Sequence, residues 1–179
     1  MLLETARRAL ASYVPSDARE LGFRQRITEL LGCPAPFSRS SFQPGHLTAS
    51  AFVVSPTGDA LLLILHKKLG LWLQPGGHVE PDDASLEAAA RREVLEETGI
   101  ALGRHAPAEI FDVDIHSIPA RKDEPEHEHF DVRFCFRAET LELEARDEVA
   151  GARWVELATL ERLTGDESVL RAARKLGRP

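Results

Sequence analysis

Three glutamates, Glu93, Glu96 and Glu97, lie within five positions of one predicted helix. Residues three and four apart share one face of a helix, so all three carboxylates project from the same side. If these groups are partly buried, two carboxylates about 5.5 Å apart repel by roughly 3 kcal/mol at an effective dielectric constant of 20. Arg92 reaches Glu96 at i+4, but one guanidinium cannot neutralise three carboxylates. The segment therefore needs either a further cation or a solvated surface.

A hard divalent cation would satisfy the first requirement. Mg²⁺ takes oxygen ligands in octahedral geometry, usually a few carboxylates together with substrate phosphates. Gly76 and Gly77 precede the helix, and glycine allows a backbone carbonyl to come close to such an ion. Charge pattern alone favours the other interpretation, an acidic helix facing solvent. The choice therefore depends on the spacing of the surrounding residues.

Periodicity predicts the elements that must position these acids. Up to about residue 40 the pattern is helical, with one stripe through Leu3, Ala6 and Leu10 and a second helix that begins at an Asp17 N-cap. A connector rich in Pro and Ser follows at 33–45. Strands are then predicted at 47–54, 60–66, 71–73, 109–116, 130–136 and 152–157, and helices at 84–98 and after Asp166.

The strand predicted at 109–116 alternates apolar and polar residues. Phe111, Val113 and Ile115 are expected to face the core. Asp112 and Asp114 then lie on the opposite face, where they would contact solvent or form a wall of a substrate site.

Composition limits the classes of function. The 179 residues fit one domain with a small appendage, and 43% hydrophobic and 28% charged residues are ordinary for a soluble protein. A net charge of −7 without a dense Lys/Arg block argues against a nucleic acid duplex as partner. Apolar runs are too short for a membrane span, and the start lacks the pattern of a signal peptide. With only Cys33 and Cys135, we expect a cytoplasmic protein with two reduced, buried thiols.

The segment from Arg92 to Ile100 resembles the second half of the Nudix box, the signature of the Nudix hydrolases, written G-x5-E-x7-R-E-U-x-E-E-x-G-U with U aliphatic. Every specified position of that half is matched, by Arg92, Glu93, Val94, Glu96, Glu97, Gly99 and Ile100. The first half differs, because fourteen residues separate Gly77 from Arg92 where the box has thirteen. We place the extra residue in the loop ahead of the helix, so that Asp83 or Ala84 stands at the position of the first glutamate.

The resemblance implies a fold and a domain organisation. It implies a Nudix-type α/β/α sandwich with a mixed β-sheet over residues 41–179. The helical pattern of residues 1–40 predicts an N-terminal helical extension that is not part of the common core of the family. That extension is expected to form a pocket wall or a homodimer contact.

The resemblance also implies an activity, a hydrolase that cleaves a phosphoanhydride bond of a nucleoside diphosphate derivative by attack of water at phosphorus. Its glutamates would hold Mg²⁺ or Mn²⁺, here Glu93, Glu96 and Glu97, oriented by Arg92. A backbone carbonyl of Gly77 and the carboxylate of Glu148 would complete the metal shell. We favour Glu93 as general base, with Glu96 and Glu148 as alternatives.

Other polar residues are weaker candidates for the site. His66 and Lys68 follow a strand and could meet substrate phosphates, or could end that strand in solvent. His127 and His129 share a face at i, i+2 spacing. Without a third well-spaced histidine we favour a polar loop over a transition-metal site, and we keep His127 as a substrate contact.

Two other functions of the Nudix fold stay open. One is a nucleotide-sensing module without turnover, which the intact glutamates argue against. The other is an isoprenoid diphosphate isomerase, which would require a catalytic cysteine. RNA decapping is a hydrolytic variant that the negative charge disfavours.

Overall fold

The structure is a computed structural model that describes residues 1–103, 108–121, 124–144 and 146–177. The chain forms two compact units. The first comprises Met1–Ser50, Gly77–Ala90 and Glu109–Phe134, and the second comprises Ala51–Gly76, Arg91–Ala108 and Cys135–Pro179. Four elements contribute residues to both units: β1 (Gly45–Val54), β4 (Gly76–His78), α3 (Leu86–Thr98) and β6 (His127–Arg137).

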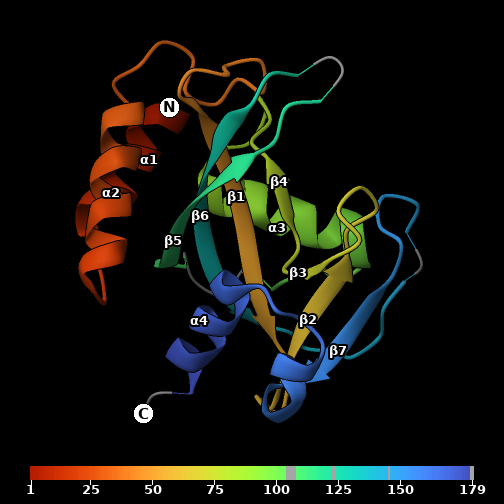
Figure 1. The fold of residues 1–179 in the computed structure, drawn as a ribbon. Helices are drawn as coiled ribbons and strands as arrows, with labels where there is room; N and C mark the ends of the chain where they lie inside the picture. The colour runs from red at the N-terminus through yellow and green to blue at the C-terminus, as the bar shows by residue number, and fades with distance from the viewer. Residues whose placement is uncertain (104–107, 122–123, 145, 178–179) are drawn as a thin grey trace. The chain divides into compact units, whose positions relative to one another are not determined.

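The N-terminal helices belong to the first unit. Helix α1 (Leu2–Ser12) lies beside α2 (Ala18–Leu30), and α2 also contacts β5 (Ile110–Ile118) (Figure 1). Ala6 and Leu10 of α1 and Ile27 and Leu30 of α2 are buried, as periodicity predicts. The stripes are incomplete, because Leu3 is half-buried and Leu21 is 40% exposed. The side chain of Asp17 accepts a hydrogen bond from the Glu20 amide at 2.8 Å, which confirms the predicted N-cap.

Strands β5 and β6 form an antiparallel pair in the first unit, with Ile115 opposite Phe130 and His116 opposite His129. Much of the pair is buried on both faces. The expectation that Asp112 and Asp114 face solvent or substrate is wrong, because they are 0% and 6% exposed. Both bind the guanidinium of Arg133, at 3.3 and 3.2 Å.

Arg133 is itself 1% exposed, and its Nε also donates to Asp131 at 2.8 Å. The hydroxyls of Thr48 and Ser50 donate to the same aspartate. Buried charges are tolerated when they are paired and hydrogen-bonded. The polar residues of these strands therefore form an internal ion-pair network.

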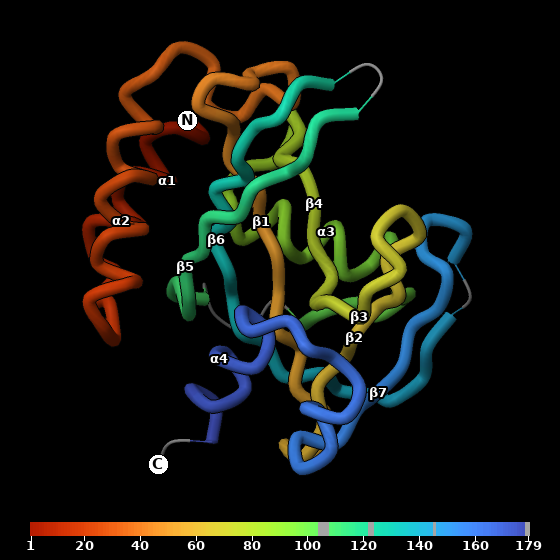
Figure 2. The backbone as a smooth tube through the Cα atoms, viewed as in Figure 1, coloured from red at the N-terminus to blue at the C-terminus, as the bar shows by residue number. Residues whose placement is uncertain are grey.

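Strand β2 (Ala60–Leu65) is the centre of the second unit. It pairs antiparallel with β3 (Trp72–Leu73), with β7 (Ala152–Glu156) and with the end of β1 (Figure 2). Its apolar residues from Leu61 to Ile64 are at most 2% exposed, and β2 is paired along both edges.

The second unit ends in a 3-10 helix η1 (Leu157–Arg162) and α4 (Glu167–Leu176). The side chain of Asp166 accepts hydrogen bonds from the amides of Ser168 and Val169, so this predicted cap is also confirmed. Residues 76–78, predicted as a glycine loop, instead form β4, which pairs with β1. Within the described part of the chain, no helix has the length and hydrophobicity required to cross a membrane.

Candidate metal and active site

The acidic segment lies in the second half of α3, within the second unit. Val94 and Ile100 are at most 1% exposed and anchor this segment to the core. Gly99 ends the helix with φ 77°, and its amide donates to the Leu95 carbonyl at 2.9 Å. A Cβ at Gly99 would lie 2.7 Å from the Cβ of Glu144. The end of the acidic helix is therefore held closely against the Glu144 loop.

Arg92 connects two of the three glutamates. Its Nη1 donates to Glu93 Oε1 at 2.9 Å and to Glu96 Oε2 at 2.8 Å. The side chain of Glu93 is 14% exposed and that of Glu96 is 42% exposed. The structure thus brings together the three residues predicted to be catalytic, and it places the arginine where it can orient both carboxylates.

Among the three glutamates of α3, Glu97 is the most buried and is 9% exposed. Its Oε2 accepts a hydrogen bond from the Gly76 amide at 3.0 Å. Burial raises the pKa of Glu97 to about 8, against the lowering effect of that hydrogen bond, and the charges of Glu93, Glu148 and Glu96 raise it further.

Burial likewise raises the pKa of Glu93 to about 7, although the guanidinium of Arg92 opposes the rise. Glu96 and Glu148 contribute to the rise through their negative charge. The charges of Glu96 and Glu148 thus act on both Glu93 and Glu97, so Glu148 lies near the three glutamates of α3.

The turn that carries His66 and Lys68 lies beside the Glu148 loop. The Leu65 amide donates to the Gly151 carbonyl at 2.7 Å, and Lys67 Nζ donates to the Asp147 carbonyl. His66 Nδ1 accepts from the Leu69 amide at 3.2 Å. Lys68 is exposed. His66 and Lys68, the predicted phosphate contacts, therefore lie near the loop that carries Glu148, a predicted metal ligand.

The remaining residues considered for the site belong to the first unit. Gly77 and His127 belong to the first unit, so their roles as carbonyl ligand and substrate contact stay predictions. Asp83 lies in the loop ahead of α3, where its Oδ2 accepts from the Glu80 amide at 2.8 Å. Ala84 lies in the same loop and is exposed.

The two cysteines differ in burial. Cys33 is exposed, so the prediction that both thiols are buried is wrong for this residue. Cys135 is half-buried, and burial raises the pKa of its thiol to about 11. Since the thiolate is the reactive species, Cys135 is unreactive at neutral pH.

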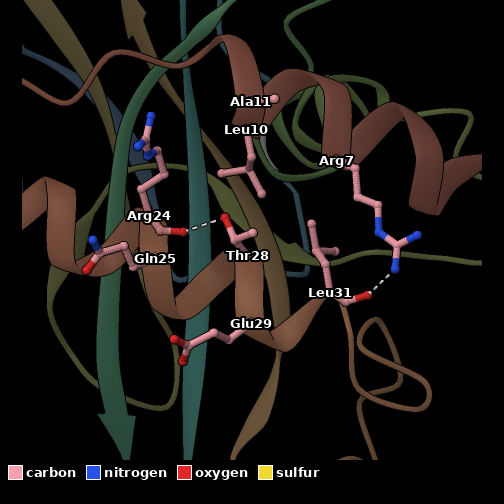
Figure 3. Close-up of a pocket in the computed structure, with 8 residues that line it drawn as sticks. All are labelled: Arg7, Leu10, Ala11, Arg24, Gln25, Thr28, Glu29 and Leu31. Atoms are coloured by element: carbon pink, nitrogen blue, oxygen red, sulfur yellow. Dashed lines mark hydrogen bonds between the residues drawn. The ribbon is translucent and has the colours of Figure 1, made fainter.

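A cavity of about 630 Å³ lies between the two N-terminal helices (Figure 3). Arg7 donates to the Leu31 carbonyl at 3.0 Å across one end, and Arg24 and Glu29 also line it. None of the residues predicted for the active site lines this cavity. The domain boundary at residue 40 and the role of these helices stay predictions.

Sequence reasoning missed a cluster of histidines in the first unit. The rings of His46 and His78 lie 5.0 Å apart, and those of His46 and His129 lie 4.8 Å apart. His46 is isolated in sequence, and only the pairing of its strand brings it to the others. The i, i+2 spacing of His127 and His129 was the one signal available in the sequence.

The donor set of the acidic segment fits a hard divalent cation. Its glutamate side chains offer only carboxylate oxygens. The pKa values of Glu93 and Glu97 are raised because burial makes the ionised carboxylate unfavourable. Mg²⁺ and Mn²⁺ prefer such oxygens, and their charge would favour the ionised carboxylates.

Comparison with known proteins shows what the chain is similar to. The family model described as the NUDIX domain matches residues 44–175. A probable DHNTP pyrophosphohydrolase of Lactococcus lactis is 36% identical over 122 residues, which cover 66% of this chain and 70% of the relative. A putative 8-oxo-dGTP diphosphatase of Bacillus subtilis is 47% identical over 53 residues, 29% of this chain and 35% of that relative.

The crystal structure of a MutT NUDIX hydrolase from Burkholderia pseudomallei superimposes with a TM-score of 0.56 at 27% identity, over 72% of this chain and 95% of that one. The expected fold class is thereby confirmed. Through the matched family model, the Lactococcus relative and the shared fold, this chain belongs to the Nudix hydrolases, a family of pyrophosphohydrolases.

Proposed function

We propose that the chain hydrolyses a phosphoanhydride bond of a nucleoside diphosphate derivative, with Mg²⁺ or Mn²⁺ held by Glu93, Glu96 and Glu97. The observation that carries this proposal is the burial of Glu97 among like charges. A carboxylate with its pKa near 8 is unfavourable in the ionised form unless a cation accompanies it. The hydrogen bond from the Gly76 amide favours the ionised form of Glu97, which is the form that binds a metal ion.

Each residue then has a defined task. Arg92 holds Glu93 and Glu96 in one orientation through two hydrogen bonds of 2.8–2.9 Å, so that little reorganisation is needed when substrate binds. The Gly76 amide fixes Glu97 in the same way. When bound, the divalent ion supplies charge neutralisation for the phosphate oxygens and lowers the pKa of a water molecule.

We assign proton removal to Glu93. In the metal-free chain burial raises its pKa to about 7, and the charge of a bound divalent ion would favour the ionised form that accepts a proton. The water oxygen forms a bond to phosphorus as its proton passes to Glu93, and the bond from phosphorus to the bridging oxygen breaks. The leaving phosphate departs with the electron pair of that bond. Glu148, which is exposed near the same carboxylates, is the alternative base.

The substrate class follows from the relatives and from the charge of the chain. The two relatives are named as a pyrophosphohydrolase and a diphosphatase, which favours a small nucleotide-like diphosphate. We place His66 and Lys68 as contacts for its phosphates. The net charge of −7 disfavours a nucleic acid duplex as partner.

The test is a panel of dinucleotides, nucleotide sugars and nucleoside triphosphates, each assayed with Mg²⁺, with Mn²⁺ and with EDTA. We expect metal-dependent release of a phosphate product by the wild-type chain. Glu97→Gln should abolish this release while the fold is retained, and Glu161→Gln, an exposed glutamate of η1, should not affect it. Unchanged turnover in Glu97→Gln would refute the assignment.

A further inference from the structure

Ring nitrogens of three histidines lie close together in the first unit. One ligand atom from each of His46, His127 and His129 lies within 4.8 Å of the others. Their ring centroids are 4.8–5.2 Å apart. The rings of His78 and His116 pack around the edge of this group, at 5.0–5.5 Å. All five histidines belong to the same unit.

The backbone brings these residues together in two ways. His127 and His129 stand two apart on β6 and therefore share a face. His46 comes from the start of β1, where the Glu128 amide donates to the Pro44 carbonyl at 3.1 Å. Gly45 allows this close approach, because a Cβ there would lie 1.8 Å from the Glu128 carbonyl oxygen.

Hydrogen bonds fix the tautomers of two of the rings. His46 Nδ1 lies 3.1 Å from the Ser41 carbonyl and His127 Nδ1 lies 2.8 Å from the Pro125 carbonyl. A carbonyl oxygen can only accept, so each Nδ1 must carry the proton. In the neutral ring, Nε2 then keeps its lone pair. This is the arrangement of metal-binding histidines, in which a backbone carbonyl orients the ring through the other nitrogen.

His46 gives the strongest indication of a ligand. It is 0% exposed, and its Nε2 has no hydrogen-bond partner among the described residues. Leaving a buried polar atom without a hydrogen-bond partner destabilises the folded state. A metal ion bound to that lone pair would remove this cost.

The chemistry of the three donors indicates which metal they would bind. Neutral imidazole suits Zn²⁺, Cu²⁺, Fe²⁺ and Ni²⁺, whereas Mg²⁺ prefers oxygen.

We propose that His46, His127 and His129 form a transition-metal site, of which Zn²⁺ is the expected occupant. Zn²⁺ binds three histidines at 2.0–2.1 Å and leaves a fourth position for water or another ligand. In the structure the three nitrogens lie within 4.8 Å of one another. Tetrahedral coordination would place them about 3.4 Å apart, so the rings would rotate to bring the nitrogens closer together when the ion binds. The site uses residues of the first unit only, and it does not depend on the proposed role of the glutamates.

The experiment measures Zn²⁺ and Co²⁺ binding to the full-length, metal-stripped chain. Glu93→Gln and Glu97→Gln are combined in the parent protein so that the glutamates do not take up the added ion. We expect one Zn²⁺ per chain by calorimetry, and Co²⁺ should give the intense visible absorption of tetrahedral coordination. His127→Gln and His129→Gln each remove a ligand, so each should weaken Zn²⁺ binding by at least the roughly 10–100-fold that loss of an outer-shell partner costs.

His116→Gln is the matched control, because it removes an imidazole that touches His129 but is not in the triad. Its dissociation constant for Zn²⁺ should lie within about threefold of that of the parent protein. Circular dichroism checks the fold of each variant, and the less buried His129→Gln decides the result if His127→Gln fails to fold. Absence of saturable Zn²⁺ binding in the parent, or equal binding by folded His129→Gln and the parent, would overturn the proposal.

Discussion

Glu97→Gln should make the metal-free protein more stable at alkaline pH. The substitution keeps an oxygen that can accept from the Gly76 amide, and it removes a buried negative charge. The folded-state pKa of Glu97 is raised from 4.5 to about 8. Between these values the folded chain holds a proton that the unfolded chain has released, so the wild-type free energy of unfolding falls as pH rises.

The size of the effect follows from these two values. At about 1.36 kcal/mol per pH unit, the interval from 4.5 to about 8 corresponds to roughly 4–5 kcal/mol. For a chain of this length, each kcal/mol changes Tm by about 2–4 °C. Glu97→Gln should therefore unfold on the order of 10 °C above wild type at pH 8.5, and the two should coincide near pH 4.5.

The assay is thermal unfolding in EDTA from pH 4.5 to pH 8.5, repeated with Mg²⁺. Saturating Mg²⁺ should stabilise the wild type, by about 2.7 kcal/mol at 100 times the dissociation constant, and should stabilise the variant far less. Glu161→Gln serves as the control and should follow the wild-type curve. If Glu97→Gln were no more stable than wild type in EDTA at pH 8.5, the argument from buried charge would be wrong.

Three further predictions concern other positions. Arg133→Met should lower the free energy of unfolding by about 3–5 kcal/mol in urea titrations, because three buried aspartates lose their counter-ion. The control Arg162→Met removes an exposed guanidinium and should change the free energy of unfolding by less than about 0.5 kcal/mol. Asp17→Ala should cost about 1 kcal/mol through loss of the α2 cap, measurable as a Tm lower by about 2–4 °C; an unchanged Tm would show that the cap contributes nothing. Arg92→Lys should reduce kcat roughly tenfold with the fold intact, because an ammonium lacks the planar fork that holds two carboxylates; wild-type kcat would exclude an orienting role.

Local features of the fold were predictable from sequence. Caps depend on one side chain and the amides two or three residues later, so Asp17 and Asp166 could be identified without tertiary contacts. Helical spacing likewise placed the three glutamates of α3 on one face, and the i+4 contact of Arg92 with Glu96 is present. The matched half of the box lies within ten residues of one helix and its terminus, which explains why it could be recognised.

Prediction failed where burial depends on neighbouring strands. Alternation of apolar and polar residues suggested that Asp112 and Asp114 face outward, because an exposed face is the usual reason for polar residues in a strand. Both are buried, since Arg133 on the adjacent strand supplies the compensating charge. Their partner is about 20 positions away in sequence, and only strand register brings it into contact.

The sequence by itself determined the spacing of the acidic residues on one helix, and with it the recognition of the family. Tertiary structure alone decided how deeply Glu97 is buried, and hence its raised pKa. It also decided that His46 joins His127 and His129, which are more than 80 positions further along the chain. The physical reason is that spacing along one element is fixed by backbone geometry, whereas burial and contacts between elements depend on which surfaces pack together.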